Sequence, residues 1–321
     1  MKRILGALTV AAALLIAVGG AQAQQKNFSI VTGGTGGVYY PLGGALANML
    51  GKYNPGWSAT AEVTGGSVDN LKLIGAKRAD IAFTQVDASY DAVKGQDKFK
   101  GAPVKHLALA VLYPNIMHVV TVEGKGINTV MDLKGKRVST GSPGSATEVF
   151  AFRIIEAAGL DKDKDMTRER LGAAESTNAI KDGKIDAYFF VAGVPTSAIT
   201  DLGATPGTTL KLIDHSSFVP KMNEKYGPLY SPGVIKKGSY PGQDKDNQVA
   251  TVWNAMVVAD TMPDDVAYKI TKTVFDHLDE WATVHKEALN VKLENQKQAN
   301  SAVPFHPGAL KFFAEKGIKV N

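Results

Sequence analysis

The stretch Thr32-Gly33-Gly34-Thr35-Gly36-Gly37-Val38-Tyr39-Tyr40-Pro41 overlaps the end of a short β-branched run, Phe28–Thr32. Beyond Pro41, apolar residues recur at helical spacing until Gly51, namely Leu42, Leu46, Met49 and Leu50. Proline is favoured in the first turn of a helix and glycine just past its last turn. The stretch therefore predicts a strand, a glycine loop and a helix, which is the first unit of an α/β fold.

A second copy of this plan begins 108 residues further along the chain. Thr140-Gly141-Ser142-Pro143-Gly144-Ser145 stands where Thr32–Gly37 stands in the first copy, and a helix over residues 146–158 is predicted to follow it. Lys77–Phe83 is likewise echoed by Gly183–Phe189. Two matches in the same order favour two halves of similar plan. Each half is expected to be a mostly parallel sheet flanked by helices.

Other segments suggest where the chain crosses between the halves. Residues 220–247 contain no long apolar period and are expected to be irregular and exposed. Pro263 is predicted to open a long helix that includes Trp281. Met117–Glu123 and Val249–Ala259 are the natural extended crossings, so we expect residues 24–117 and 250–321 to form a first, discontinuous lobe and residues 118–249 a second.

The N-terminus predicts export from the cytoplasm. Lys2 and Arg3 precede an uncharged stretch, Ile4–Val18, and small residues ending in Ala21-Gln22-Ala23 follow, which is typical of a signal peptide over residues 1–23. The alternative is a membrane anchor, but the run of 15 residues is shorter than the roughly 20 that span a bilayer. Cleavage after Ala23 removes two cations and lowers the net charge from +5 to +3, which is too small for nucleic-acid binding. The periplasm is the expected location.

Composition and motifs disfavour most enzyme classes. The chain has no cysteine, which excludes disulfides, thiol catalysis and cysteine metal sites. Its six histidines form no H-E-x-x-H motif and no pair four residues apart, and neither a dinucleotide fingerprint, a P-loop nor a G-x-S-x-G motif is present. No cofactor and no metal are expected. A secreted hydrolase or transferase stays open, because catalytic residues can converge from distant positions.

Three predicted helices begin after small, glycine-rich loops that end near Gly37, Ser67 and Ser145. A helix N-terminus carries unpaired N–H groups and a partial positive charge, and glycine lets a ligand approach the backbone. The alternative is plain helix capping, since Ser145 and Glu148 form a capping box. Two such loops at equivalent strand ends favour a site for a carboxylate between the halves.

Five ordered motifs of this chain resemble the TAXI family, the extracytoplasmic solute-binding proteins of TRAP (tripartite ATP-independent periplasmic) transporters. They cover nearly the whole mature chain and are Thr32–Pro41, Thr64–Asn70, Ala79–Gln85, Leu133–Val138 with Pro143–Ser145, and Phe189–Pro195. The resemblance implies a two-lobed periplasmic binding protein fold of type II character. It also implies a non-enzymatic protein that captures glutamate, 2-oxoglutarate or a similar dicarboxylate by domain closure and delivers it to fused or separate membrane subunits.

Carrying the family pattern onto this chain gives a set of expected ligand-binding residues, spread over the two glycine loops and three strand ends. They are Thr35, Gly36, Gly37, Tyr39, Ser67, Gln85, Gly144, Ser145, Thr147, Ala192 and Gly193. Ala146 departs from the family, in which Gly or Ser commonly follows Pro-Gly-Ser. No arginine lies in any of the loops, so amides and hydroxyls are expected to hold the ligand, and a monomer is expected.

Overall fold

The structure is a computed structural model and describes residues 25–320. In this range the chain alternates between strands and helices, as the sequence predicts for an α/β fold. The strands are β1 (Lys26–Val31), β2 (Trp57–Glu62), β3 (Ile81–Gln85), β4 (His106–Val122), β5 (Arg137–Ser139), β6 (Thr167–Glu169), β7 (Ala187–Ala192), β8 (Leu210–Leu212), β9 (Tyr230–Ile235) and β10 (Asn247–Ala259). The helices are α1 (Tyr39–Tyr53), α2 (Ser67–Gly75), α3 (Val86–Lys94), α4 (Ala146–Ala157), α5 (Ala173–Lys181), α6 (Ser197–Gly203), α7 (Val219–Tyr226), α8 (Asp264–Asp276), α9 (Leu278–Val284) and α10 (Pro307–Glu315).

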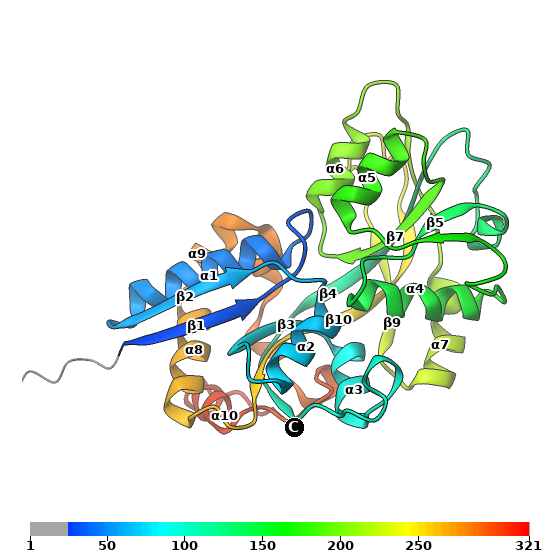
Figure 1. The fold of residues 1–321 in the computed structure, drawn as a ribbon. Helices are drawn as coiled ribbons and strands as arrows, with labels where there is room; N and C mark the ends of the chain where they lie inside the picture. The colour runs from blue at the N-terminus through cyan, green and yellow to red at the C-terminus, as the bar shows by residue number, and fades with distance from the viewer. Residues whose placement is uncertain (1–24, 321) are drawn as a thin grey trace, which may run out of the picture.

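The ten strands form one mixed sheet (Figure 1). Its order is β2-β1-β3-β10-β4-β7-β5-β6, and in addition β8 pairs with β4 and β9 with β10. At each end the pairs are parallel, β1 with β2 and β3, and β5 with β6 and β7. The sheet is less parallel than expected because every pair made by the two long strands β4 and β10 is antiparallel.

The long strands β4 and β10 run through both ends of the sheet. The first part of β4 pairs with β10, whereas its last part, Ile116–Thr121, pairs with β7. Strand β10 pairs with β9 over Asn247–Val252 and with β3 over Asn254–Val258. The register between the two long strands shifts between Trp253 and Ala255, where β10 changes partners from β9 to β3, and again between Met256 and Val257.

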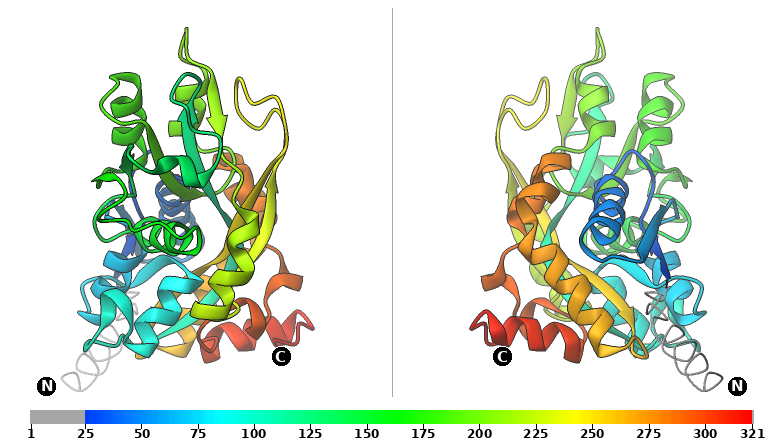
Figure 2. Two further views of the ribbon diagram at one scale, coloured as in Figure 1. Left: turned by 90° about the vertical axis from the view of Figure 1, so that its right-hand side faces the viewer. Right: turned by 90° about the vertical axis from the view of Figure 1, so that its left-hand side faces the viewer.

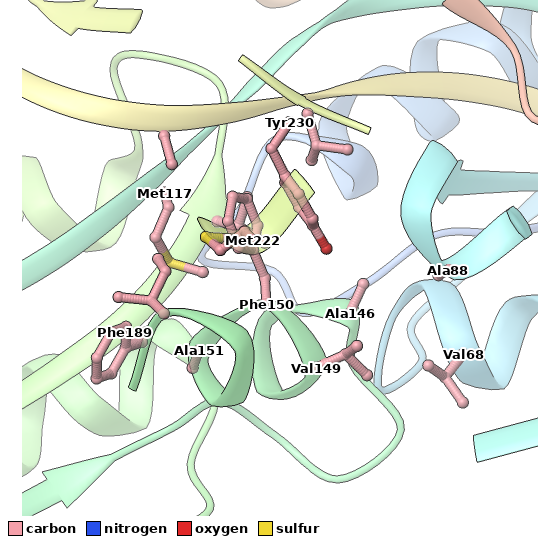
Figure 3. Packing of buried hydrophobic residues seen from close by; sticks show 14 of the residues in the cluster. Val68, Ala88, Met117, Ala146, Val149, Phe150, Ala151, Phe189, Met222 and Tyr230 are labelled. Atoms are coloured by element: carbon pink, nitrogen blue, oxygen red, sulfur yellow. The ribbon is translucent and has the colours of Figure 1, made fainter. Parts of the chain in front are cut away.

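Three buried hydrophobic clusters hold the layers together. One lies under α1, α8 and α10 and includes Trp281, whose indole donates a hydrogen bond to the Leu42 carbonyl at 2.8 Å. A smaller one lies around α5 and α6. The third continues from Val68 and Ala88 of α2 and α3 to Phe150 of α4, so helices that follow strands of opposite ends of the sheet share one core (Figure 3).

Two expectations about the second half of the chain are wrong in detail. Residues 220–247 include most of α7, all of β9 and the buried Tyr240, so this region is more ordered than predicted. The helix expected after Pro263 ends at Asp276, and α9 starts at Leu278. The break falls at His277, whose ring stacks on Tyr53 of α1 with 3.5 Å between ring centroids.

The C-terminal helices return to the first part of the chain. Helices α8 and α9 contact α1, and α10 packs on α8 (Figure 2). No helix within residues 25–320 is long and apolar enough to cross a membrane. The predicted signal peptide lies outside the described residues.

Candidate functional site

A cavity lies where loops from both ends of the sheet meet. It leaves about 670 Å³ of empty space, including the solvent at its mouth. The walls come from the loops before α1, α2, α4 and α5, from the ends of β3 and β7, and from the middle of β4. The lining residues are Gly33–Tyr39, Gly65–Ser67, Gln85, Tyr113, Asn115, Ser142, Ser145–Thr147, Gly172–Glu175 and Phe190–Ala192. The cavity is therefore at the carboxyl ends of the parallel strands, where open α/β sheets bind ligands.

Most of the residues expected from the sequence line this cavity. These are Thr35, Gly36, Gly37, Tyr39, Ser67, Gln85, Ser145, Thr147 and Ala192. Gly144 and Gly193 do not line it. A side-chain carbon on Gly144 would lie 2.1 Å from Asp69 Oδ1, and one on Gly193 would lie 2.4 Å from Glu287 Cγ. Both glycines make room for another part of the protein rather than opening onto the cavity.

Several helices begin at the cavity wall. Helices α1, α2 and α5 have Val38, Gly66 and Gly172 as N-cap residues, none of which supplies a side-chain cap. Helix α4 differs, because Ser145 Oγ accepts a hydrogen bond from Glu148 N at 3.1 Å and donates one to the Ser142 carbonyl at 2.7 Å. First-turn N–H groups without a side-chain cap, together with the helix dipoles, favour a negative charge at the wall without any basic side chain. Part of this capacity is already used, because Asp69 N donates to the Gly144 carbonyl and because Asp69 and Glu175 place carboxylates in the first turns of α2 and α5.

Three buried polar atoms of the cavity wall have no hydrogen-bond partner in the described part of the chain. They are Gln85 Oε1, Tyr113 Oη and Asn115 Oδ1, on residues that are 3%, 0% and 1% exposed. More than nine in ten buried polar groups in proteins are hydrogen-bonded, and an unpaired one costs about 1–3 kcal/mol. Because the three residues line one cavity, a bound polar molecule there, ordered water included, is the partner that such atoms ordinarily have.

The cavity wall carries little formal charge. Its lining residues, all within 25–320, include no Lys, Arg or His, and one carboxylate, that of the exposed Glu175. Burial raises the pKa of Tyr39 and of Tyr113 above the usual phenol value, so both stay protonated at neutral pH. The Tyr39 hydroxyl donates a hydrogen bond to Asn254 Oδ1, which holds its ring in place.

The two arginines nearest in sequence to the second glycine loop are used elsewhere. Arg137 binds Asp186, with Nη2 and Oδ1 2.7 Å apart. Arg153 binds Asp91, with Nη2 and Oδ2 2.5 Å apart. Backbone amides, hydroxyls and side-chain amides therefore make up the polar surface offered to a ligand.

Loops from the two ends of the sheet touch one another around the cavity. Ser142 Oγ donates to the Gly65 carbonyl at 3.0 Å, and Asp69 N donates to the Gly144 carbonyl at 3.0 Å. On another side, Ser197 Oγ donates to the Gly36 carbonyl at 3.0 Å. Loops on both sides of the site are thus in contact in this structure.

Sequence reasoning missed the contributions of β4 and of the loop before α5. Tyr113 and Asn115 lie in the middle of a long strand, and no local pattern marks them as wall residues. Gly172 before α5 repeats the pattern of a glycine before a helix start and could have been found. Phe190 also lines the cavity, and its ring packs close to Gly37. A Cβ atom on Gly37 would lie 3.2 Å from that ring.

Groups suited to metal or acid–base chemistry are not gathered at the cavity. Within residues 25–320 no three His, Asp or Glu side chains are placed to hold a metal ion. Three histidines, His106, His118 and His215, are buried away from the cavity wall, and burial lowers the pKa of each to about 4.

Comparison with solved structures identifies the architecture. The periplasmic binding protein BugD is 15% identical, with 92% of this chain and 99% of that chain covered and a TM-score of 0.55. A protein of Bordetella bronchiseptica RB50 is 18% identical, with 90% and 88% covered and a TM-score of 0.52. An ancestral arginine-binding protein bound to arginine is 12% identical, with 82% and 98% covered and a TM-score of 0.50. At these identities the likeness establishes the two-lobed α/β fold of periplasmic binding proteins.

A family model agrees with this architecture over almost the whole described chain. The model is that of the NMT1-like family, and it matches residues 30–317, which include every wall of the cavity and both long strands. The chain belongs to the NMT1-like family.

Proposed function

We propose that this protein is an extracytoplasmic solute-binding protein that captures a small organic acid in the cavity described above. The proposal rests on two features of the same cavity wall. Helix N-termini without side-chain caps begin there, and three of its residues carry buried polar atoms that lack a partner among the described residues. The N–H groups suit a carboxylate, while Gln85, Tyr113 and Asn115 suit the polar groups elsewhere on the ligand.

The resemblance to the TAXI family narrows the ligand and the partner. Glutamate, 2-oxoglutarate and similar dicarboxylates are the ligand class that we propose, and the partner is the membrane permease of a TRAP transporter. The protein acts in the periplasm, after removal of the signal peptide. The family match and the binding-protein fold of the structural neighbours support a transport role rather than the alternative of a secreted hydrolase or transferase.

We propose that the ligand lies between two lobes, residues 24–117 with 250–321 and residues 118–249. The loops at Gly36 and Ser67 belong to the first lobe, whereas those at Ser145 and Ala173 belong to the second. The change of pairing partners along β4 and β10 near residues 116 and 253 supports this division, because both crossings lie there.

A thermal-shift panel tests the proposed function. A ligand that binds only the folded protein stabilises it by about 2.7 kcal/mol when present at 100 times its Kd. We expect L-glutamate, 2-oxoglutarate or a related dicarboxylate to raise the melting temperature, and the ligand to be recovered unchanged after overnight incubation. A rise with neutral sugars or cationic amino acids only would contradict the proposal. Chemical conversion of the ligand would instead support the alternative function, a secreted hydrolase or transferase.

A further inference from the structure

A buried ion cluster joins two helices that begin at the cavity. It consists of Asp87 and Asp91 of α3, Arg153 of α4 and Tyr230 of β9, and we call it the Arg153 cluster. Arg153 Nη1 donates to Tyr230 Oη at 2.7 Å, and Tyr230 Oη donates to Asp87 Oδ2 at 2.8 Å. Arg153 Nη2 binds Asp91 Oδ2 at 2.5 Å. Each of the four residues is less than 5% exposed, so the cluster is closed to water.

The surroundings of the Arg153 cluster are apolar. Phe150 packs against the Tyr230 ring with 4.6 Å between centroids, and Ala88 and Val149 belong to the same hydrophobic cluster (Figure 3). Helix α3 starts directly after Gln85, and α4 directly after Ser145, both of which line the cavity. The Arg153 cluster therefore lies where the proposed lobes share a core, and it joins α3 to α4 one to two turns beyond their starts at the cavity.

The charges in the Arg153 cluster do not balance. It contains two carboxyl groups and one guanidinium, and no second cation of residues 25–320 forms an ion pair with either carboxyl group. The nearby lysines have other partners, since Lys98 pairs with Glu148 at 3.1 Å and Lys225 pairs with Glu156.

The other titratable groups that face the cluster add no positive charge. Asp97 lies 3.9 Å from Arg153, the ring of Tyr226 lies 4.3 Å from its guanidinium, and Tyr39 lies near Asp87. Burial raises the pKa of Asp91 to about 6 and also raises the pKa of Asp87, while the charge of Arg153 opposes both shifts.

We propose that the Arg153 cluster is a proton-sensitive brace between α3 and α4, neutral when one of its carboxyl groups holds a proton and negatively charged when both are ionised. Because the brace joins the two lobes, it stabilises their contact, and with it the folded protein, more strongly at pH 5 than at pH 7.5. This inference goes beyond the proposed function and does not depend on the identity of a ligand.

Urea unfolding between pH 4.5 and 7.5 tests the brace by comparing wild type with Asp91→Asn. A carboxyl group with a raised pKa in the folded state contributes stability at low pH that is lost as the pH rises through that pKa. Relative to Asp91→Asn, the folded-to-unfolded ratio of the wild type should fall by up to about tenfold per pH unit until about pH 6 and then level off. Parallel curves over the whole range would overturn the proposal.

Two controls isolate the effect. The buried histidines, whose lowered pKa values make stability fall toward acidic pH, are present in both proteins and cancel in the comparison. For Asp276, partial burial is outweighed by ion pairs with Lys272 and Lys316, which hold its pKa below the usual value. Asp276→Asn should therefore give a curve parallel to that of the wild type in this range.

A measurement on the wild type alone covers the case in which Asp91→Asn does not fold. Carbon-13 NMR of aspartate-labelled protein should show a carboxyl group that titrates near pH 6. If every aspartate carboxyl titrates below about pH 4.5, near the usual value for this residue, the proposal is wrong.

Discussion

Gln85 is the residue whose substitution best distinguishes an effect on ligand binding from an effect on folding stability. It is the N-cap residue of α3, but its side chain makes no capping hydrogen bond, and Oε1 has no partner among the described residues. Gln85→Ala should therefore leave the free energy of unfolding nearly unchanged and raise the Kd of the ligand by about fivefold or more, the loss of about 1 kcal/mol from one hydrogen bond. Isothermal calorimetry with the acid identified in the panel measures the Kd.

Ser145→Ala is the matched comparison, because Ser145 lines the same cavity and also caps α4. Its removal should cost about 1 kcal/mol of folding stability in urea unfolding. If Ser145 contacts the ligand, affinity also falls, and an unchanged Kd would leave Ser145 as a cap alone. A Gln85→Ala variant with wild-type affinity would show that Oε1 does not face the ligand.

At the scale of elements, the close approach of α2 to the loop before α4 depends on Gly144. This residue has φ +77°, and a side-chain carbon there would overlap the carboxylate of Asp69 in the first turn of α2. Gly144→Ala should destabilise the protein by about 1–3 kcal/mol, through backbone strain and displacement of α2. The midpoint of urea unfolding measures this loss.

Gly34→Ala is the control for that substitution. Gly34 lies in the other glycine loop, its φ is not in the left-handed region, and nothing lies within 4 Å of a side-chain carbon there. The variant should keep nearly the wild-type midpoint. Equal stability of the two variants would mean that α2 and the loop adjust freely to one another.

The same elements show what the sequence predicts and what it leaves open. The starts of α2 after Gly66 and of α4 after Ser145 follow from local chemistry, because a glycine loop and a capping residue mark them. Helix α1 begins at Tyr39, two residues before the Pro41 that the sequence suggests as its opening residue. Strand β9 is not predicted by the sequence because it contains Pro232, and proline argues against a central strand. The structure tolerates Pro232 because β9 is an edge strand, which pairs with β10 alone among the strands of residues 25–320.

Wall residues on β4 could not be predicted for a different reason. Tyr113 and Asn115 reach the cavity because β4 pairs with β10, more than 130 residues away, and with β7. Gly144 and Gly193 carry the same local signal as the wall glycines, yet they face Asp69 and Glu287. Only tertiary contacts distinguish a glycine that opens a ligand site from one that admits a neighbouring side chain.

At the scale of the whole molecule, the contacts around the cavity suggest the direction in which it opens. On one side α3 and α4 share a hydrophobic core and the Arg153 cluster. On the other side, the Gly36 loop contacts α6 through the hydrogen bond from Ser197 Oγ to the Gly36 carbonyl. The same loop approaches α5 so closely that a Cβ atom on Gly36 would lie 3.2 Å from Ala174 N. Just before α6, Val194 N also donates to Glu287 Oε1 at 2.7 Å, and His285 Nε2 lies 3.1 Å from the Pro195 carbonyl oxygen. None of these contacts is a buried ion pair like that of Arg153, so we expect opening to pivot about α3 and α4 and to separate α1 from α5.

Ligand binding should therefore close the protein in one defined direction. A ligand that touches both lobes has contacts in the closed form that the open form lacks, and this difference in affinity is what shifts the equilibrium. Small-angle scattering should give a smaller radius of gyration with saturating ligand.

Because the chain has no cysteine, spin labels can be placed at Asn48→Cys and Asn178→Cys, on exposed positions of α1 and α5. Their separation should shorten with ligand, while that of a second pair, Lys94→Cys and Glu156→Cys on α3 and α4, should stay constant. Equal shortening of both pairs would place the pivot elsewhere, and unchanged distances with an unchanged scattering curve would mean that the ligand enters a rigid site.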